Sequence, residues 1–151
     1  MKFDILEMKE SHRSLILQMM ETFYHSPAVA TDGSTEIYQA DITACVSDSP
    51  YAQGYIFFLD NQAVGYGMLA KSFSTEFGRP CIWIEDLYLV PSARNQGLGS
   101  LFLQKVRADF PEAILRLEVE EENLPAMHTY KKNGYQTMGY TELYHIQDPH
   151  H

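Results

Sequence analysis

The residues best suited to chemistry form a short glycine-containing segment, Arg94-Asn95-Gln96-Gly97-Leu98-Gly99. It follows an apolar run closed by Pro91 and precedes a stripe of apolar residues at helical spacing. Glycines at the start of a helix let backbone N–H groups approach an anion, and the helix N-terminus adds unpaired donors and a favourable dipole. Arg94 adds positive charge. The segment predicts a phosphate or pyrophosphate site, although the same glycines also suit a plain tight turn.

Two common nucleotide-binding motifs do not fit this segment. The dinucleotide fingerprint GxGxxG needs a third glycine at position 102, where the chain has Phe102. A P-loop needs Gly-Lys-Ser/Thr, and the sequence contains no such run. The turn therefore keeps an anion-binding character but matches neither pattern.

A second candidate for chemistry is Glu85, within the strand-like run Trp83-Ile-Glu85-Asp86-Leu-Tyr-Leu. Strict alternation along a strand divides this run into two faces, with Trp83, Glu85, Leu87 and Leu89 on one and Ile84, Asp86 and Tyr88 on the other. A carboxyl group among apolar neighbours resists ionisation, which raises its pKa towards a range useful for a general base. We interpret Glu85 as a candidate base, with a structural carboxylate paired to a cation as the alternative.

The elements that must position these residues follow from periodicity and from Gly and Pro punctuation. The first half is predicted to hold a strand (3–8), a helix of about 14 residues that includes the apolar stripe 15–23, a second helix (35–47) and a hairpin (54–59 and 63–70). The second half is predicted to hold a strand (81–90), a helix from 98 to before Pro111, a strand (114–119), a helix between Asn123 and Gly134, and one or two final strands (135–146). The order β-α-α-β-β-β-α-β-α-β-β indicates an α/β (α+β) fold. Its mixed, mostly antiparallel sheet is flanked by helices in a single domain, residues 1–151, with one βαβ unit at 81–119.

Composition narrows the classes of partner. The chain has 151 residues, 45% of them hydrophobic and 21% charged, with a formal net charge of −9. An acidic balance argues against nucleic acid as a partner and is compatible with a small cationic substrate. No apolar run approaches the roughly 20 residues that span a bilayer, and no signal-peptide pattern opens the chain, so a cytoplasmic, membrane-free protein is expected. The six histidines have no metal-ligand spacing, so no metal is expected.

Two motifs together carry a family resemblance. Arg94-x-x-Gly97-x-Gly99 resembles the acetyl-CoA signature of the GNAT superfamily of N-acetyltransferases, Arg/Gln-x-x-Gly-x-Gly/Ala. Downstream, Asn123-Leu-Pro-Ala-Met-His-Thr-Tyr130-Lys-Lys-Asn-Gly134-Tyr135 resembles that family's Asn-x-x-Ala-x-x-x-Tyr-x-x-x-Gly-Phe/Tyr motif. The resemblance covers about residues 81–135, and the run around Glu85 is similar to the corresponding strand of spermidine/spermine and thialysine acetyltransferases. The chain departs from the pattern at Ala93 and Asn95, where members often have an aromatic residue and a glycine.

The resemblance implies the GNAT fold and acetyl-CoA as the acyl donor. It assigns the pyrophosphate to the turn and the pantetheine arm to the backbone of the preceding strand. The pyrophosphate set in the turn comprises Arg94, Asn95, Gln96, Gly97, Leu98, Gly99 and Ser100. The pantetheine set in the strand comprises Leu87, Tyr88 and Leu89. A ligand arm in that place also predicts a splay between the strands at 81–90 and 114–119. Asn123 would contact the donor or fix the turn.

By the same resemblance, Glu85 stands at the position of the catalytic base, and Tyr130 at the position of the acid that protonates the leaving thiolate. An alkylammonium with a pKa of about 10 must lose a proton before its nitrogen can attack. Backbone N–H groups can polarise the thioester carbonyl meanwhile. Asp86 faces away from Glu85 in strict alternation, which suits it to fixing an amine or a neighbouring loop.

Three functions stay open at this point. The leading one is transfer of an acetyl group from acetyl-CoA by direct attack of a primary amine, with a small cationic amine such as a polyamine or a lysine-like compound favoured over a protein or peptide amine. The second is a non-catalytic acyl-CoA-binding regulatory domain. The third, a dinucleotide-dependent oxidoreductase, is disfavoured by Phe102 and by the chain's length. The acceptor, the acyl group and the oligomeric state stay open, with a homodimer as one candidate.

Overall fold

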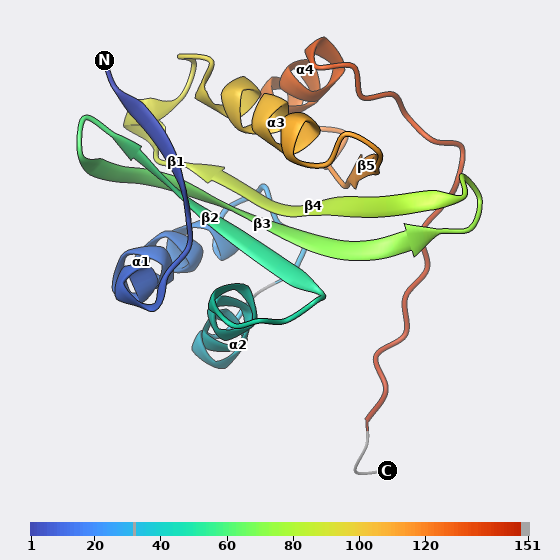
Figure 1. Ribbon diagram of the computed structural model, residues 1–151, viewed down its shortest axis with the longest axis horizontal. Helices are drawn as coiled ribbons and strands as arrows, with labels where there is room; N and C mark the ends of the chain where they lie inside the picture. The colour runs from blue at the N-terminus through green and yellow to red at the C-terminus, as the bar shows by residue number, and fades with distance from the viewer. Residues whose placement is uncertain (32, 149–151) are drawn as a thin grey trace.

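A five-stranded sheet with helices on both faces organises the chain in the computed structural model, which describes residues 1–31 and 33–148 (Figure 1). Its elements are β1 (Phe3–Glu7), α1 (Arg13–Tyr24), α2 (Thr35–Val46), β2 (Ala52–Leu59), β3 (Gln62–Ser74), β4 (Arg79–Leu89), α3 (Leu98–Asp109), β5 (Ile114–Leu117) and α4 (Leu124–Lys132), with short 3-10 turns at Glu10–His12 and Pro91–Ala93. The strands lie in the order β1-β2-β3-β4-β5, all antiparallel except the parallel pair β4–β5. The predicted mixed, mostly antiparallel fold class is confirmed.

The hairpin between β2 and β3 forms because two residues accept left-handed backbone. Asp60 and Asn61 have φ angles of 49° and 69°. Asn and Asp tolerate this region better than other non-glycine residues, and two successive left-handed residues make the tight turn that matches strand twist. The Asp60 carboxylate also accepts a hydrogen bond from the Lys2 backbone N–H at 2.8 Å, which fixes the start of β1 beside the turn.

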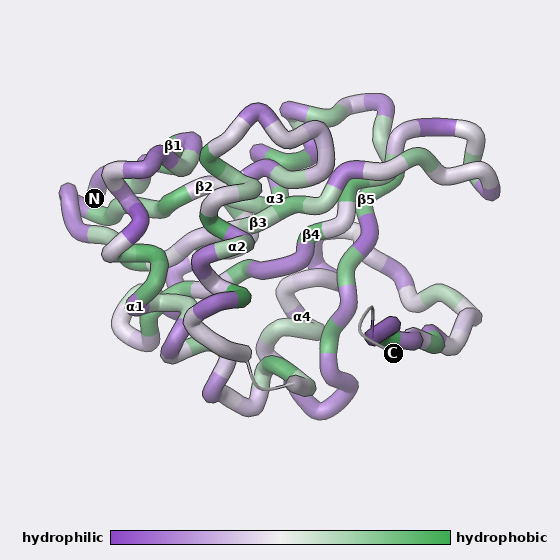
Figure 2. Tube along the Cα trace, turned by 90° about the horizontal axis from the view of Figure 1, so that it is seen from below, coloured by the Kyte–Doolittle hydropathy of each residue, from purple (hydrophilic) through white to green (hydrophobic). Residues whose placement is uncertain are grey.

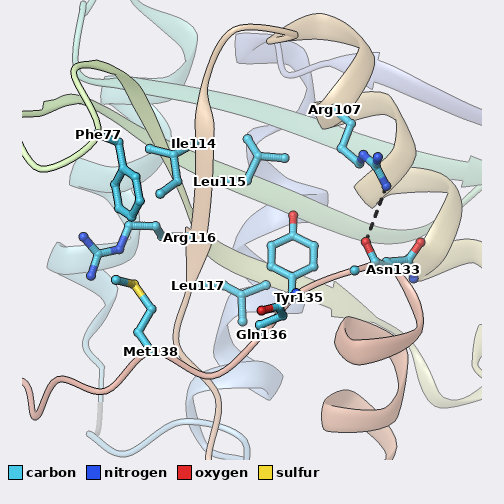
Figure 3. A pocket seen from close by; sticks show the side chains of 11 residues that line it. Phe77, Arg107, Ile114, Leu115, Arg116, Leu117, Asn133, Tyr135, Gln136 and Met138 are labelled. Atoms are coloured by element: carbon cyan, nitrogen blue, oxygen red, sulfur yellow. Dashed lines mark hydrogen bonds between the residues drawn. The ribbon is translucent and has the colours of Figure 1, made fainter.

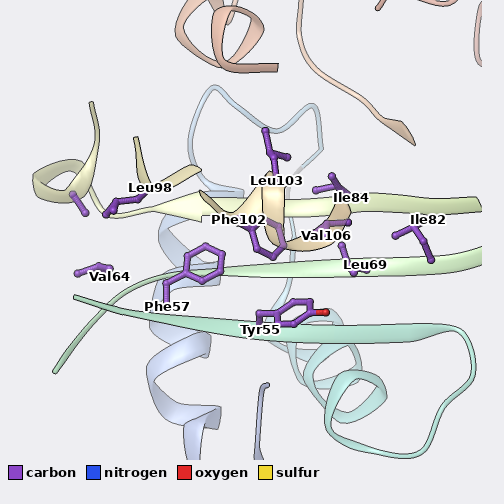
Figure 4. Packing of buried hydrophobic residues seen from close by; sticks show 11 residues of the cluster. Tyr55, Phe57, Val64, Leu69, Ile82, Ile84, Leu98, Phe102, Leu103 and Val106 are labelled. Carbon is purple, nitrogen blue, oxygen red and sulfur yellow. The ribbon is translucent and has the colours of Figure 1, made fainter. Parts of the chain in front are cut away.

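Two apolar clusters hold the helices on the sheet, one on each face. Figure 4 shows the cluster under α3, where Phe102 packs against Tyr55 and Phe57 with ring centroids 5.5 and 5.0 Å apart. The other face carries α1 and α2, and its cluster includes Ile16, Met20, Tyr38, Ile42 and Tyr66. Apolar positions therefore run through the interior of the molecule, while polar residues dominate the turns and helix outer faces (Figure 2).

The approach of α3 to the sheet depends on Gly67 in β3. A Cβ atom built at this glycine would lie 2.4 Å from Cζ of Phe102. We expect Gly67→Ala to lower the free energy of unfolding by about 1–3 kcal/mol, because the added methyl overpacks a core that contains no space for it. Urea denaturation measures the loss. Gly139→Ala is the matched control, since nothing lies within 4 Å of its Cβ position; equal stability of both variants would contradict this packing.

The final strands predicted at residues 135–146 are wrong. Residues 135–148 form no strand and run as an extended tail from α4 past the outer side of β5 (Figure 1). The Tyr and Thr content that prompted the prediction reports how well side chains fit a half-buried pleated surface, and residues 135–148 form no ladder with β5 or with any other strand. Elsewhere the predicted elements are confirmed, with ends that differ by up to a few residues; β5, for example, stops at Leu117 rather than at 119.

Candidate active site

The strand that carries Glu85 contains a β-bulge. In the antiparallel ladder Met68 pairs with Asp86 and Leu69 pairs with Ile84, so Glu85 is the extra residue without a partner. A bulge changes which face the following side chains occupy. The predicted alternation is therefore wrong beyond Glu85: Ile84 and Leu87 both pack in the cluster under α3, whereas Asp86 is buried on the side of α1 and α2.

At the bulge, the exposed carboxylate of Glu85 is followed directly by the buried carboxylate of Asp86. The Glu85 side chain is solvent-accessible. Partial burial, followed by the negative charges of Asp86 and Glu142, raises the pKa of Glu85 above its usual range. A carboxyl group with a raised pKa and access to a ligand meets two requirements of a general base.

The splay predicted between β4 and β5 is confirmed. The parallel ladder joins only four residue pairs, from Cys81 with Ile114 to Ile84 with Leu117. β5 ends there, while β4 continues to Leu89 and stays paired on its other edge with β3. The edge of β4 that follows Glu85 therefore has backbone groups outside the β4–β5 ladder, which suits the amide-rich arm predicted to bind along Leu87, Tyr88 and Leu89.

The glycine turn at the end of β4 has the geometry of an anion site. Gly97 is the N-cap of α3 with φ +80°, and Asn95 has φ +62°. Asparagine is among the non-glycine residues that best tolerate this conformation, so Asn95 can occupy a position where related sequences often have glycine. The first backbone N–H groups of α3, at Leu98, Gly99 and Ser100, have no partner within the helix. These donors fit a pyrophosphate, although their contact with one stays a prediction.

Left-handed backbone at Gly97 allows a sharp test of the turn. We expect Gly97→Ala to weaken acetyl-CoA binding about tenfold, because an L-residue at φ +80° costs about 1–2 kcal/mol and relaxation moves the donors. Gly99→Ala is the matched control, since its Cβ would meet only Leu89 and Thr129 side-chain carbons at 3.9 Å. Isothermal titration calorimetry compares the two, and equal dissociation constants would contradict the role of Gly97.

Arg94 and Gln96 hold the turn in place through their side chains. Arg94 Nε donates to the Leu89 carbonyl at 2.9 Å, and its guanidinium lies 5.8 Å from the Tyr88 ring centroid. Gln96 Nε2 donates to the Ser92 carbonyl at 3.0 Å. These bonds tie the turn to Leu89 at the end of β4 and to the 3-10 turn Pro91–Ala93. The guanidinium is exposed and keeps donors available for an anion.

The second motif packs beside the first. Asn123 is the N-cap of α4, where its side chain accepts from the Ala126 N–H at 3.4 Å, so its predicted role in fixing the local turn has a direct geometric basis. At the other end of α4, Asn133 Nδ2 donates to Ser100 Oγ at 2.9 Å and joins α4 to the first turn of α3. Tyr130 lies between these points, packed against the α3-side core, and burial raises the pKa of its hydroxyl.

Sequence reasoning missed a set of groups around Asp86. The buried Asp86 carboxylate accepts from Tyr24 Oη at 2.9 Å and from Tyr66 Oη at 2.7 Å. Asp41 of α2 interacts electrostatically with Asp86 and Glu85. Its pKa is raised to about 6, first by burial and then by the charges of these two residues. Helical spacing could have identified Asp41 as a candidate. It follows Tyr38 by three positions and therefore lies near the apolar face of α2.

A further pair of carboxyl groups, Glu118 and Glu142, interacts electrostatically with Glu85. Glu118, just after β5, shares a hydrogen bond with Glu142 of the tail, and this contact, with partial burial, raises the pKa of Glu118 to about 7. Glu118 also senses the charge of Glu85. Several carboxyl groups with raised pKa values therefore influence one another around the bulge.

Comparison with known proteins supplies the family. Residues 16–135 match the acetyltransferase (GNAT) family. The chain belongs to this family. A bovine thialysine N-epsilon-acetyltransferase is 35% identical over 116 residues, which cover 75% of this chain and 64% of the bovine protein. The mouse protein of the same name is 35% identical over 86 residues, 52% of this chain and 48% of that protein. The GNAT chain thus spans less than two thirds of these relatives.

Solved structures support the GNAT fold. An aminoglycoside N-acetyltransferase, AAC(6')-Iy, in complex with CoA, superposes with a TM-score of 0.78 at 14% identity, covering 97% of this chain and 96% of that one. A structure described as a possible acetyltransferase from Clostridium difficile 630 gives 0.80 at 16% identity, over 97% and 99%. Within residues 1–31 and 33–148 of the GNAT chain, no helix is long and apolar enough to cross a membrane, and no group of His, Cys, Asp or Glu suits a metal ion.

Proposed function

We propose that this GNAT chain transfers the acetyl group of acetyl-CoA to a primary amine by direct attack. The observation that carries the proposal is the place of Glu85: an exposed carboxylate with a raised pKa at a bulge, where β4 and β5 separate and where β4 leads into the anion-binding turn. Acyl transfer to an amine needs a base at the acceptor nitrogen and donors along the acyl carrier. The chain offers these features along a single strand.

Each residue has a distinct task in this mechanism. Glu85 accepts a proton from the acceptor ammonium, directly or through a water molecule, and so frees the nitrogen lone pair for attack on the thioester carbonyl. As the carbon–sulfur bond breaks, the Tyr130 hydroxyl donates its proton to the departing thiolate, and the second proton that the nitrogen loses in forming the amide passes through water and restores the Tyr130 hydroxyl. Backbone N–H groups of the turn hold the pyrophosphate, and the free edge of β4 aligns the pantetheine arm. Attack is direct, and no acyl group becomes attached to the protein.

The charges near Glu85 favour a small cationic amine as acceptor. Burial and then the charges of Asp86 and Glu85 raise the pKa of Asp41, and burial and then the charge of Asp86 raise the pKa of Glu85, so an acceptor at these carboxyl groups would meet negative charge. A bound ammonium group would compensate this charge. Asp86 is already engaged by Tyr24 and Tyr66, so Asp41 and Glu85 are the carboxylates free to face an acceptor. The relatives named for acetylating the epsilon nitrogen of thialysine support the same class.

The raised pKa of Asp41 also affects the stability of the folded protein. Its pKa is raised from 3.8 to about 6, so the folded state binds its proton more tightly than the unfolded state does. Stability contributed by protonated Asp41 is therefore lost as pH rises through the interval between these values. We expect Asp41→Asn to raise the melting temperature, relative to wild type, more at pH 7 than at pH 4. Scanning calorimetry at both pH values checks this, and an equal difference at both would contradict it.

A panel of acceptors tests the proposed function itself. Release of the CoA thiol is followed with polyamines, lysine-like amino acids, aminoglycosides and peptides, in wild type and in Asp41→Asn. We expect turnover with small cationic amines and an increase in KM for them in the variant. Turnover only with peptides would move the acceptor to a protein or peptide amine. Acetyl-CoA binding without turnover on any amine would instead indicate a non-catalytic acyl-CoA-binding domain.

A further inference from the structure

Within β4, all of which the structure describes, Glu85 is the one residue that pairs with neither neighbouring strand. On one edge, β3 pairs with every residue of β4 except Glu85, which the bulge skips. On the other edge, the ladder with β5 ends at Ile84. A residue outside both ladders can change its backbone direction unless its neighbours along the chain are held. The direction of the Glu85 side chain therefore depends on what holds the flanking residues.

The residue that follows the bulge is held at both oxygens of its carboxylate. Asp86 Oδ1 accepts a hydrogen bond from Tyr24 Oη at 2.9 Å, and Oδ2 accepts one from Tyr66 Oη at 2.7 Å. Tyr24 is the last residue of α1 and Tyr66 lies in β3, so two different elements hold the same side chain. Asp86 is only 5% exposed. A buried carboxylate with two donors is confined, because moving away from either one leaves polar atoms without partners.

Aromatic packing holds the two phenol rings in turn. The ring of Tyr66 is fully buried, and its centroid lies 6.3 Å from that of Phe23 and 6.1 Å from that of Tyr88. The ring of Tyr24 lies 5.3 Å from that of Tyr38 and 5.4 Å from that of Phe23. Rings packed in this way have few alternative rotamers. The two hydroxyl groups therefore have fixed positions on the side of the sheet that carries α1 and α2.

We propose that Asp86 is a positioning residue, which Tyr24 and Tyr66 hold so that it fixes the bulge and directs the Glu85 carboxylate toward the acceptor. This role rests on the proposed function, in which Glu85 is the base. Asp86 does not contact the acceptor, because its side chain is buried and both of its oxygens are engaged. The groove of about 440 Å³ between β5 and residues 135–138 (Figure 3) is lined by none of these four residues, so it gives a ligand no access to them.

Removal of both phenol hydroxyls would release this anchor without emptying the space that the rings fill. Burial raises the pKa of Asp86, and the two hydrogen bonds act in the opposite direction. Without them, a buried carboxylate has lost the donors that stabilise its charge. Such a group either takes up a proton or turns toward water. Both responses loosen the hold of Asp86 on the bulge, and the effect should appear at Glu85.

Backbone NMR relaxation at Glu85 tests the anchor in the free protein, without substrate. We expect the order parameter of the Glu85 amide to fall from about 0.85 to about 0.6 when Tyr24→Phe and Tyr66→Phe are combined. Tyr24→Phe alone keeps the Tyr66 bond, should show a smaller fall, and carries the test if the double variant does not fold. Tyr55→Phe is the matched control, because its hydroxyl donates to Asp109 on the α3 side of the sheet. An unchanged order parameter without exchange broadening, or an equal fall in the control, would overturn the proposal.

Kinetics separate a positioning role from direct contact with the acceptor. For positioning, the double variant should lose at least about tenfold in kcat with KM for the acceptor nearly unchanged. Asp86→Asn, whose amide can accept from one phenol and donate to the other, should retain more of kcat than Asp86→Ala.

The opposite pattern would overturn the proposal. If Asp86 binds the cation of the acceptor, Asp86→Asn raises KM, and the double variant, which frees both carboxylate oxygens, keeps kcat. A fall in the order parameter at Glu85 with unchanged kcat would also overturn it, but in a distinguishable way. That result would remove Glu85 from the reaction, and with it the proposed function, while Asp86 would still anchor the bulge.

Discussion

Glu85→Gln is expected to lower kcat for an ammonium acceptor at neutral pH by about 10²–10⁴-fold, the usual contribution of a positioned general base. Glutamine keeps the size of the side chain but cannot accept the proton. Because the side chain is exposed at a bulge and has no ladder partner, the substitution should leave the fold and acetyl-CoA affinity nearly unchanged. Steady-state kinetics, together with calorimetric titration of acetyl-CoA, separates loss of chemistry from loss of binding.

The pH profile gives the same prediction a second readout. The rate of wild type should rise as pH passes the raised pKa of Glu85, because only the ionised carboxylate accepts a proton. In Glu85→Gln this limb should disappear, and the residual rate should rise only towards the pKa of the free amine, about 10. Glu118→Gln is the matched control, since it removes a nearby carboxylate without a role in proton transfer, and it should have a small effect. An unchanged profile in Glu85→Gln would remove Glu85 from the mechanism.

Tyr130→Phe is expected to lower kcat by about 10²-fold or more while changing acetyl-CoA affinity little, because the lost hydroxyl is the acid for the departing thiolate. The ring keeps its packing against the α3-side core and its contact with Tyr135, at a centroid distance of 6.1 Å, so the fold should not change. Pre-steady-state measurement of CoA thiol release shows whether chemistry, rather than product release, has slowed.

The control for Tyr130 is Tyr55, a buried tyrosine of the same core cluster. Tyr55 Oη donates to Asp109 at 3.3 Å, and its ring packs on Phe102. Tyr55→Phe removes one hydroxyl of the same kind from the same core cluster and should cost stability without lowering kcat. If both variants lose turnover equally, the effect of Tyr130→Phe reflects packing, and the acid must be sought elsewhere.

Local sequence pattern predicted most of the fold because its signals are short-range. The helical stripe from Leu98 to Val106, the Asp60–Asn61 turn and the Asn123 cap each depend on neighbours within a few residues. The bulge at Glu85 could not be predicted in this way, because it arises from how Met68 and Leu69 of β3 pair with β4. Local alternation contains no information about a residue that the partner strand skips.

The candidate site was predictable where a motif carried it and not where tertiary packing did. The turn from Arg94 to Gly99 was found from its glycines, and its left-handed residues are where the motif needs them. The Tyr24–Asp86–Tyr66 hydrogen bonds join α1, β4 and β3, which lie far apart in the chain, so no spacing rule reveals them. The prediction of strands in the tail was wrong for a related reason, because strand propensity without a partner strand does not make a strand.

The most direct measurement of the central claim is transfer of isotopically labelled acetyl from acetyl-CoA to a primary diamine, compared with its fully N-methylated analogue, in wild type and Glu85→Gln. Mass spectrometry detects the acetylated amine, and a thiol reagent counts released CoA. The mechanism predicts stoichiometric acetylamine and CoA thiol with the primary amine, none with the methylated analogue, and a large loss in Glu85→Gln. Binding of acetyl-CoA without acetyl transfer to any primary amine, or equal transfer by both proteins, would contradict it.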